Sequence, residues 1–497
     1  MFTVHTPATH QDPTLDMQVI DFGPEICGNL HTAERREWLV TNGIGGFASG
    51  TVAGLHTRRY HGLLFAALKP PLGRVLLLSK LDAVAEYEGR QFSLSANRWG
   101  DGTIAPQEFQ CIQRFHLEGT TPVWTYAFGD VLLEKRIWMR RGVNTSCVQY
   151  HVVRGQSPIH LTLNALVNYR NYHDATQVNG WQFTIDPLEH GFRILAFEGA
   201  QPLYLMCLKG NAEAHYTWHH QFSYREEAER GLPAQEDHLH AGSFVVTLNK
   251  GETVTVVAST EGSALNSADE SLSHIRTYEH IFLKPFERMS QKFSRPTPSW
   301  VQQLLLAADQ FIVSRPLPNQ SEGHSVIAGY PWFSDWGRDT MISFPGLFLV
   351  TQRIGMAKSL LQSFAQFVDQ GMLPNRFPDA GEPPEYNTAD ATLWYFDAIR
   401  QYVEQTQDVD LLVELYPVLE DIRIIQKLGF WIQESCRRGI AHRKSQAKEG
   451  SSVKVDVFCG FFPVIPDIFY RESRTSFVPD GSPITNVRDV GKRMDSH

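Results

Sequence analysis

The sequence lacks any long uninterrupted hydrophobic run. A membrane-spanning helix needs about 18 to 20 consecutive apolar residues, and Lys69, Arg74 and Lys80 interrupt the richest apolar stretch. The first 34 residues contain neither lysine nor arginine, and no apolar block follows them. This pattern fits neither a secretory signal nor an Arg-rich transit peptide. We therefore expect a cytoplasmic protein that is not inserted in a membrane.

Cysteine is scarce, and an excess of positive charge is absent. The six cysteines are Cys27, Cys111, Cys147, Cys207, Cys436 and Cys459. They show neither CxxC nor CxxxC spacing, which excludes a zinc framework and a dense disulfide scaffold, and we interpret them as buried thiols. With 45 basic and 54 acidic residues the net charge is −9. This balance argues against nucleic acid and favours a neutral or polar ligand.

Residues from about 18 to 290 show the pattern of β-strands, because β-branched and aromatic residues alternate with polar ones between short turns. Two hairpins are predicted, one joining 74–86 to 91–94 and one joining 243–248 to 253–257, each around a turn that contains glycine. Long amphipathic crossovers between the strands are missing. The pattern therefore favours a large antiparallel sandwich over a parallel sheet.

The period of the apolar residues changes from two to about 3.6 near Pro298. Helices are predicted over 300–313, 356–368, 389–403 and 410–422. From Arg423 to His497 the pattern changes again, with 13 basic and 8 acidic residues and no comparable helices. We expect 423–497 to be an atypical tail that is out of frame or disordered.

Aromatic and charged side chains gather within residues 328–340. They are Tyr330, Trp332, Asp335, Trp336, Arg338 and Asp339. Such a mixture suits a sugar, since aromatic faces stack on pyranose rings while a carboxylate beside a guanidinium offers acceptors and donors to hydroxyl groups. The alternative is structural: Asp339 and Thr340 would cap a helix, and Arg338 would pair with Asp335.

A second polar segment precedes a predicted helix at residues 385–394. Asn387 and Thr388 are candidate helix caps. We expect Asp390 to lie one turn inside the helix and Trp394 four residues further on, so that both share one face. Capping and ligand contact are both open for this segment. Its similarity to the first cluster favours ligand contact, since helix ends at one rim of a helical barrel converge on one pocket.

Two further patterns do not predict a cofactor or a metal. Residues 43–48 match a GxGxxA dinucleotide turn, but a strand pattern follows and no acidic residue lies about 20 positions later. His215, His219 and His220 could contribute to a metal site, but no third ligand is evident.

Residues 37–54 and 57–64 resemble the amino-terminal domain of prokaryotic glycogen debranching enzymes of the amylo-alpha-1,6-glucosidase type. Residues 330–340, together with 386–394, resemble the start of their catalytic domain. The resemblance implies a multidomain β + α protein, in which an N-terminal antiparallel β-sandwich precedes an incomplete (α/α)6-type helical barrel. The expected domains are 1–290 for the sandwich and 298–422 for the first part of the barrel.

The resemblance also implies an activity, namely hydrolysis of α-1,6 branch linkages in glycogen by two carboxyl groups with inversion. Inverting enzymes hold these groups roughly 6.5 to 9.5 Å apart, and no metal or cofactor is implied. In related glucosidases the pair that matches Arg338 and Asp339 binds hydroxyls of the non-reducing glucose, with Asp335, Trp336 and Asp390 as neighbours. The expected partner is glycogen or a branched α-glucan oligosaccharide, without nucleic acid or membrane.

The sequence departs from this family in its catalytic groups. The family's general acid lies in a Thr-Trp-Met-Asp string and its base in a later glutamate, and neither motif is found here. About five helices are predicted where a complete barrel has twelve. We therefore expect a shortened debranching enzyme whose acid and base are unidentified. The alternatives are a non-catalytic α-glucan-binding remnant and an inverting phosphorylase.

Overall fold

The computed structural model describes residues 20–106, 108–263, 268–292, 298–317, 320–377, 383–388 and 390–423. All of them belong to one compact unit. The predicted tail lies outside the described residues, apart from Arg423. Among the described helices, none combines the length and the apolar character that crossing a membrane requires.

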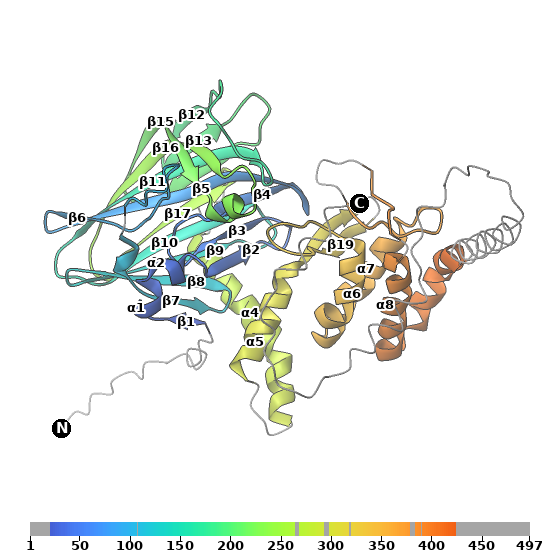
Figure 1. Cartoon of the computed structure of the whole chain (residues 1–497). Coiled ribbons are helices and arrows are strands. Elements are labelled where there is room, and N and C mark those ends of the chain that lie inside the picture. Colours follow the sequence, from blue (N-terminus) through green and yellow to red (C-terminus); the bar gives the residue numbers. More distant parts are fainter. Residues whose placement is uncertain are drawn as a thin grey trace, which may run out of the picture. The chain divides into compact units, whose positions relative to one another are not determined.

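Two antiparallel sheets form the first part of the chain (Figure 1). The first sheet has nine strands in the order β1-β7-β8-β9-β10-β17-β14-β13-β12. Its strands are β1 (Asp21–Phe22), β7 (Ile112–Glu118), β8 (Thr121–Phe128), β9 (Val131–Met139), β10 (Thr145–Arg154), β12 (Thr184–Leu188), β13 (Gly191–Leu195), β14 (Leu203–Cys207) and β17 (Thr253–Ser259).

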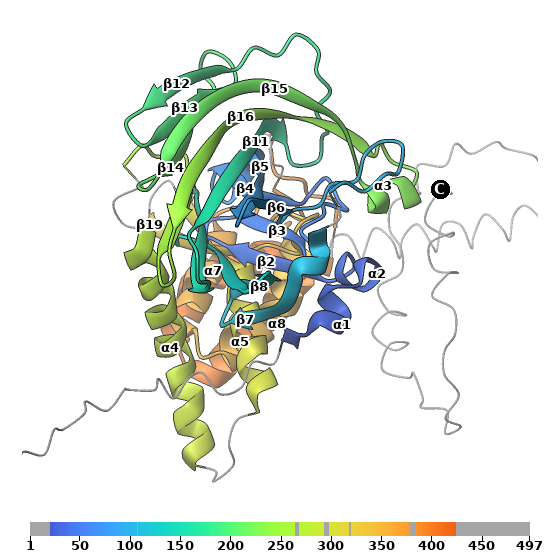
Figure 2. The ribbon, with the colours of Figure 1, turned by 90° about the vertical axis from the view of Figure 1, so that its left-hand side faces the viewer.

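The second sheet has eight strands in the order β15-β16-β11-β5-β4-β3-β2, with β6 beside β5. Its strands are β2 (Glu37–Thr41), β3 (Phe47–Thr51), β4 (Gly62–Lys69), β5 (Leu72–Tyr87), β6 (Arg90–Ser93), β11 (Ile159–Asn171), β15 (Asn211–Ser223) and β16 (Gln235–Leu248). Figure 2 shows the long strands β11, β15 and β16 arching side by side. The short helices α1 (Pro24–Cys27), α2 (Leu30–Ala33) and α3 (Arg225–Glu229) lie in the connections.

The inward side chains of both sheets form one large hydrophobic core. In β10, for example, Val148, Tyr150 and Val152 are at most 1% exposed, whereas the residues between them are more exposed. This is the period-two alternation of a strand with one buried face. The predicted antiparallel sandwich is therefore confirmed.

One predicted hairpin is confirmed and the other is wrong. β5 pairs with β6 around Glu88 and Gly89, which both have positive φ angles as a two-residue hairpin turn requires. β16 and β17, in contrast, belong to different sheets, so the turn at 249–252 carries the chain from one layer of the sandwich to the other. A turn signal shows that the chain reverses, but not whether the next strand pairs within the same sheet.

The strand pattern ends earlier than expected, because residues 268–292 form the helix α4 (Ala268–Lys292). Leu272 and Ile275 pack on the outer face of the first sheet against Trp138 and three further buried residues. The indole nitrogen of Trp138 donates a hydrogen bond of 2.8 Å to Ser271 Oγ. The expectation of strands up to residue 290 is thus wrong for this segment.

Five helices follow residue 298 among the described residues. They are α5 (Ser299–Phe311), α6 (Gly337–Phe344), α7 (Ile354–Ala365), α8 (Asp390–Thr406) and a helix over 409–423. A strand pair, β18 (Ile312–Leu317) and β19 (Gln320–Val326), separates α5 from α6, and a short π-helix (Pro345–Val350) follows α6. The four helices predicted from apolar spacing are confirmed to within three residues at each end, and the helices pack around a second hydrophobic core.

Candidate functional site

The first predicted cluster, residues 328–340, divides into a buried part and an exposed part. Asp335 is 0% exposed and forms an ion pair with Arg315 of β18, while Ser325 of β19 donates a hydrogen bond to the same carboxylate oxygen. Arg315 itself lies 4.1 Å from the ring centroid of Phe377. Asp335 therefore anchors the loop before α6, and the ion pair between Asp335 and Arg338 that we considered as an alternative is not formed.

Tyr330 and Trp332 lie between the sandwich and the helices. Tyr330 is 9% exposed and packs against Phe47 of β3, with ring centroids 5.5 Å apart. Burial raises the pKa of its phenol. Trp332 is half-buried, and the guanidinium of Arg58 lies 5.1 Å from its ring. Both side chains thus connect the two parts of the chain, and Tyr330 is too buried to contact a ligand at the rim.

The exposed part of the site is centred on Arg338. Its Nε lies 3.0 Å from Asp390 Oδ2, and its Nη2 donates a hydrogen bond of 3.0 Å to Thr388 Oγ1. Thr388 in turn donates a short hydrogen bond to Asp390. About half of each charged side chain is exposed, 45% for Arg338 and 48% for Asp390. The structure therefore brings together two residues that lie 52 positions apart in the sequence.

Helix starts position these groups. α6 begins at Gly337 and α8 begins at Asp390, and the two helices pack side by side. Asp390 is therefore the first residue of α8, so its predicted place one turn inside the helix is wrong. Asp339 is exposed in the first turn of α6. Carboxylates in the first turn of a helix are stabilised by the helix dipole.

The other predicted residues surround this centre. Asn387 is exposed and accepts a hydrogen bond of 2.9 Å from Asn375. Trp336 is half-buried, with the Arg376 guanidinium 5.9 Å from its ring. Trp394 packs partly buried against the second core. The exposed rim thus consists of Arg338, Asp339, Asn387 and Asp390. Thr388, which the sequence suggested only as a cap, is buried beneath it and bridges Arg338 and Asp390.

A close backbone contact fixes the start of α6. The amide of Gly337 donates a hydrogen bond of 2.8 Å to the carbonyl of Asn375. A Cβ atom at position 337 would lie 2.2 Å from the carbonyl oxygen of Pro374. Only glycine allows the two segments to approach this closely.

We expect Gly337→Ala to destabilise the protein and to weaken binding at the rim, because the loop at 373–377 must move away from α6. Forced overpacking costs about 1 to 3 kcal/mol. Urea denaturation followed by tryptophan fluorescence measures this loss. Gly355→Ala in α7 is the matched control, since a Cβ there meets no atom within 4 Å; an equal loss in both variants would contradict this interpretation.

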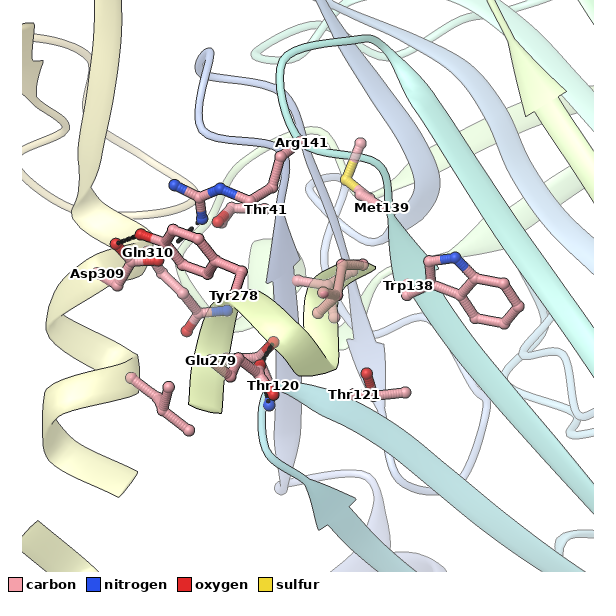
Figure 3. Close-up of a pocket in the computed structure, with 13 residues that line it drawn as sticks. Thr41, Thr120, Thr121, Trp138, Met139, Arg141, Tyr278, Glu279, Asp309 and Gln310 are labelled. Atoms are coloured by element: carbon pink, nitrogen blue, oxygen red, sulfur yellow. Dashed lines mark hydrogen bonds and ion pairs between the residues drawn. The ribbon is translucent and has the colours of Figure 1, made fainter. Parts of the chain in front are cut away.

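A separate pocket lies where the sandwich meets α4 and α5 (Figure 3). Its carboxylates have partners: Asp309 accepts from Tyr278 at 2.7 Å and from Arg141 at 2.8 Å, while Glu279 accepts from the amide of Thr120 at 2.9 Å. Arg353, just before α7, also pairs with Asp309. None of the predicted site residues lines this pocket, so we interpret it as space within a packed interface.

Two models of known protein families match the chain, one in its first part and one in its second. The family model described as glycogen debranching enzyme N terminal matches residues 36–255, and the model described as amylo-alpha-1,6-glucosidase matches residues 306–449. The glycogen debranching enzyme of Saccharomyces cerevisiae is 32% identical over 140 residues, which is 27% of this chain and 9% of the yeast protein.

Two solved structures resemble the chain only distantly. A bacterial glucoamylase complexed with acarbose has a TM-score of 0.41 and 11% identity, covering 74% of this chain and 56% of its own. A putative kojibiose phosphorylase from the human microbiome has a TM-score of 0.36 and 12% identity, covering 80% and 58%. The two family models lie in order along the chain, one on the sandwich and one on the helices, and the chain belongs to the glycogen debranching enzyme family.

Proposed function

We propose that this protein acts on branched α-glucans and that the rim formed by α6 and α8 binds their terminal glucose. The observation that carries the proposal is the exposed pair of Arg338 and Asp390 beside the exposed Asp339, held from below by the buried Thr388. A glucose unit presents several adjacent hydroxyls, each a donor and an acceptor. A guanidinium flanked by two carboxylates offers both kinds of partner, and charged hydrogen bonds are about twice as strong as neutral ones.

The proposed reaction is the hydrolysis of α-1,6 branch linkages with inversion, as expected for an amylo-alpha-1,6-glucosidase. It requires a carboxylic acid near the leaving oxygen and a carboxylate that activates water. We assign neither role to a residue here. The proposal for the reaction therefore rests on the family, whereas the proposal for glucose binding rests on the rim itself.

A second candidate is an α-glucan-binding protein without turnover. It is favoured by the sequence, because the Thr-Trp-Met-Asp string that holds the family's general acid does not occur. The third candidate, an inverting phosphorylase, would use phosphate in place of the base.

The domain limits 1–290 and 298–422 stay predictions, and the second family match continues past Arg423 to residue 449.

One set of assays on the full chain separates these functions. We expect isothermal titration calorimetry to detect binding of maltose or of a branched limit dextrin. Release of free glucose from the limit dextrin supports hydrolysis, and binding without release supports the second candidate. Glucose 1-phosphate formed only in the presence of phosphate supports the third. The absence of any binding by the folded chain would contradict all three.

A further inference from the structure

A cavity lies between the two sheets of the sandwich, and all of its lining residues fall between positions 38 and 137. The cavity volume is about 30 Å³, which is enough for about two water molecules or one small ion. Its polar and charged lining includes Lys135 of β9, Lys80 and Asp82 of β5, and His56 after β3. Charged groups rarely line the interior of a sandwich without a partner.

Lys135 occupies an inward-facing position of a core strand. Leu133 and Ile137, two positions before and after it in β9, are at most 1% exposed. Its direct neighbours on the adjacent strands are Trp124 and Tyr150. The Lys135 ammonium lies 5.5 Å from the Trp124 ring centroid and 5.8 Å from that of Tyr150. The side chain thus extends between two aromatic rings towards the cavity.

The charges around the cavity do not balance. Lys80 pairs with Asp82 at 3.1 Å and also donates a hydrogen bond of 2.8 Å to the carbonyl of Ala96. Across the described part of the chain, no carboxylate forms an ion pair with Lys135, and its ammonium lies over the two aromatic rings. One positive charge is therefore left over in the sandwich interior.

This excess charge persists at neutral pH. Burial, and secondarily the nearby Lys80, lowers the pKa of Lys135 to about 8, while Asp82 opposes the change. Most of the Lys135 amine is therefore still protonated at pH 7. Aromatic faces attract an ammonium by about 0.5 to 2 kcal/mol, so the two rings compensate the charge of the half-buried Lys135 only in part.

We propose that this cavity binds one small monovalent anion of the size of chloride, beside the Lys135 ammonium and facing the Lys80–Asp82 pair. An anion supplies the missing negative charge, which water cannot. We assign His56 as a second donor, because its Nδ1 is buried without a hydrogen-bond partner. Asp82 Oδ1 is also buried without a hydrogen-bond partner, so the anion must lie on the Lys135 side of the cavity. The small volume excludes large anions such as gluconate.

The proposal predicts an anion-specific stabilisation of the full chain. The protein is melted in sodium gluconate, and gluconate is replaced stepwise by chloride at constant ionic strength. The melting temperature should rise along a saturable curve, by about 2 to 4 °C once the chloride concentration is at least ten times the dissociation constant. Lys135→Met keeps the length of the side chain and removes its charge, so it should lose this response. Lys250→Met, at an exposed turn, should keep it.

Two results would overturn the proposal. One is a wild-type protein that melts at the same temperature in chloride and in gluconate, and the other is a Lys135→Met variant with the full chloride response. If that variant does not fold, a crystal of the wild-type protein in sodium bromide gives the decision. An anomalous peak beside Lys135 Nζ supports the anion site, whereas ordinary water density there refutes it.

Discussion

Arg338→Ala is expected to weaken the binding of maltose or limit dextrin by roughly 10- to 100-fold, because charged hydrogen bonds contribute about 1.5 to 3 kcal/mol each. The variant removes the donors to the sugar and leaves Asp390 and Thr388 without the group that orients them. The Arg338 side chain is 45% exposed, so its loss should change the free energy of unfolding by less than about 1 kcal/mol. Calorimetric titration measures the affinity.

Arg400→Ala is the matched control, since Arg400 is an exposed arginine on α8 that pairs with Asp397 and Glu404. It should bind glucan as the wild-type protein does. Arg338→Lys should recover only part of the affinity, because an ammonium cannot reproduce the planar fork that contacts both Asp390 and Thr388. Wild-type affinity in a folded Arg338→Ala protein would show that glucose binds elsewhere.

The sandwich could be predicted from sequence because strand alternation is a local signal. In β10 the apolar Val148, Tyr150 and Val152 alternate with polar residues, and Glu88 and Gly89 encode the turn of the β5–β6 hairpin. The connection from β16 to β17 could not be read in the same way. Its turn at 249–252 has hairpin-like residues, but the pairing of each strand is decided by distant partners, β11 for β16 and β10 for β17.

The missed helix α4 shows a different limit. Its apolar residues Leu272, Ile275, Tyr278, Phe282 and Phe286 recur at spacings of three and four, which is a helical pattern. The sequence therefore contained the signal for this helix, and the strand assignment overlooked it. The sequence did not show that Leu272 and Ile275 pack against Trp138 on the outer face of the first sheet.

The two segments that the sequence predicted for the candidate site lie together in the structure, but the direction of each side chain could not be predicted. Asp335 and Arg338 are three positions apart, and one is fully buried while the other is half exposed. The isolated β-bridge between Ile327 and Asp335 fixes this difference, since it aligns Asp335 with β18 and β19 before α6 begins. The partner of Asp335, Arg315, lies 20 positions away, and no local pattern pointed to it.

Asp335→Asn should therefore lower the free energy of unfolding by about 3 to 5 kcal/mol, the usual cost of removing one partner from a buried ion pair. The substitution keeps the shape of the side chain but leaves the Arg315 guanidinium, whose side chain is 11% exposed, without its counter-charge. Urea denaturation followed by tryptophan fluorescence measures the loss. Asp397→Asn, at an exposed pair on α8, should change stability by less than about 1 kcal/mol.

The double variant Arg315→Met with Asp335→Leu tests the cause of that loss. Replacing both charges by apolar groups of similar volume removes the uncompensated ion, so the double variant should be more stable than Asp335→Asn alone. The Asp335→Asn single variant should bind maltose with nearly wild-type affinity under conditions in which it is still folded. The reason is that the Asp335 carboxylate of the wild-type protein faces Arg315 and Ser325 and not the rim. A folded, fully stable Asp335→Asn protein that no longer binds glucan would instead identify Asp335 as a direct sugar ligand. The residues that bury Asp335 would then have to move apart when the sugar binds.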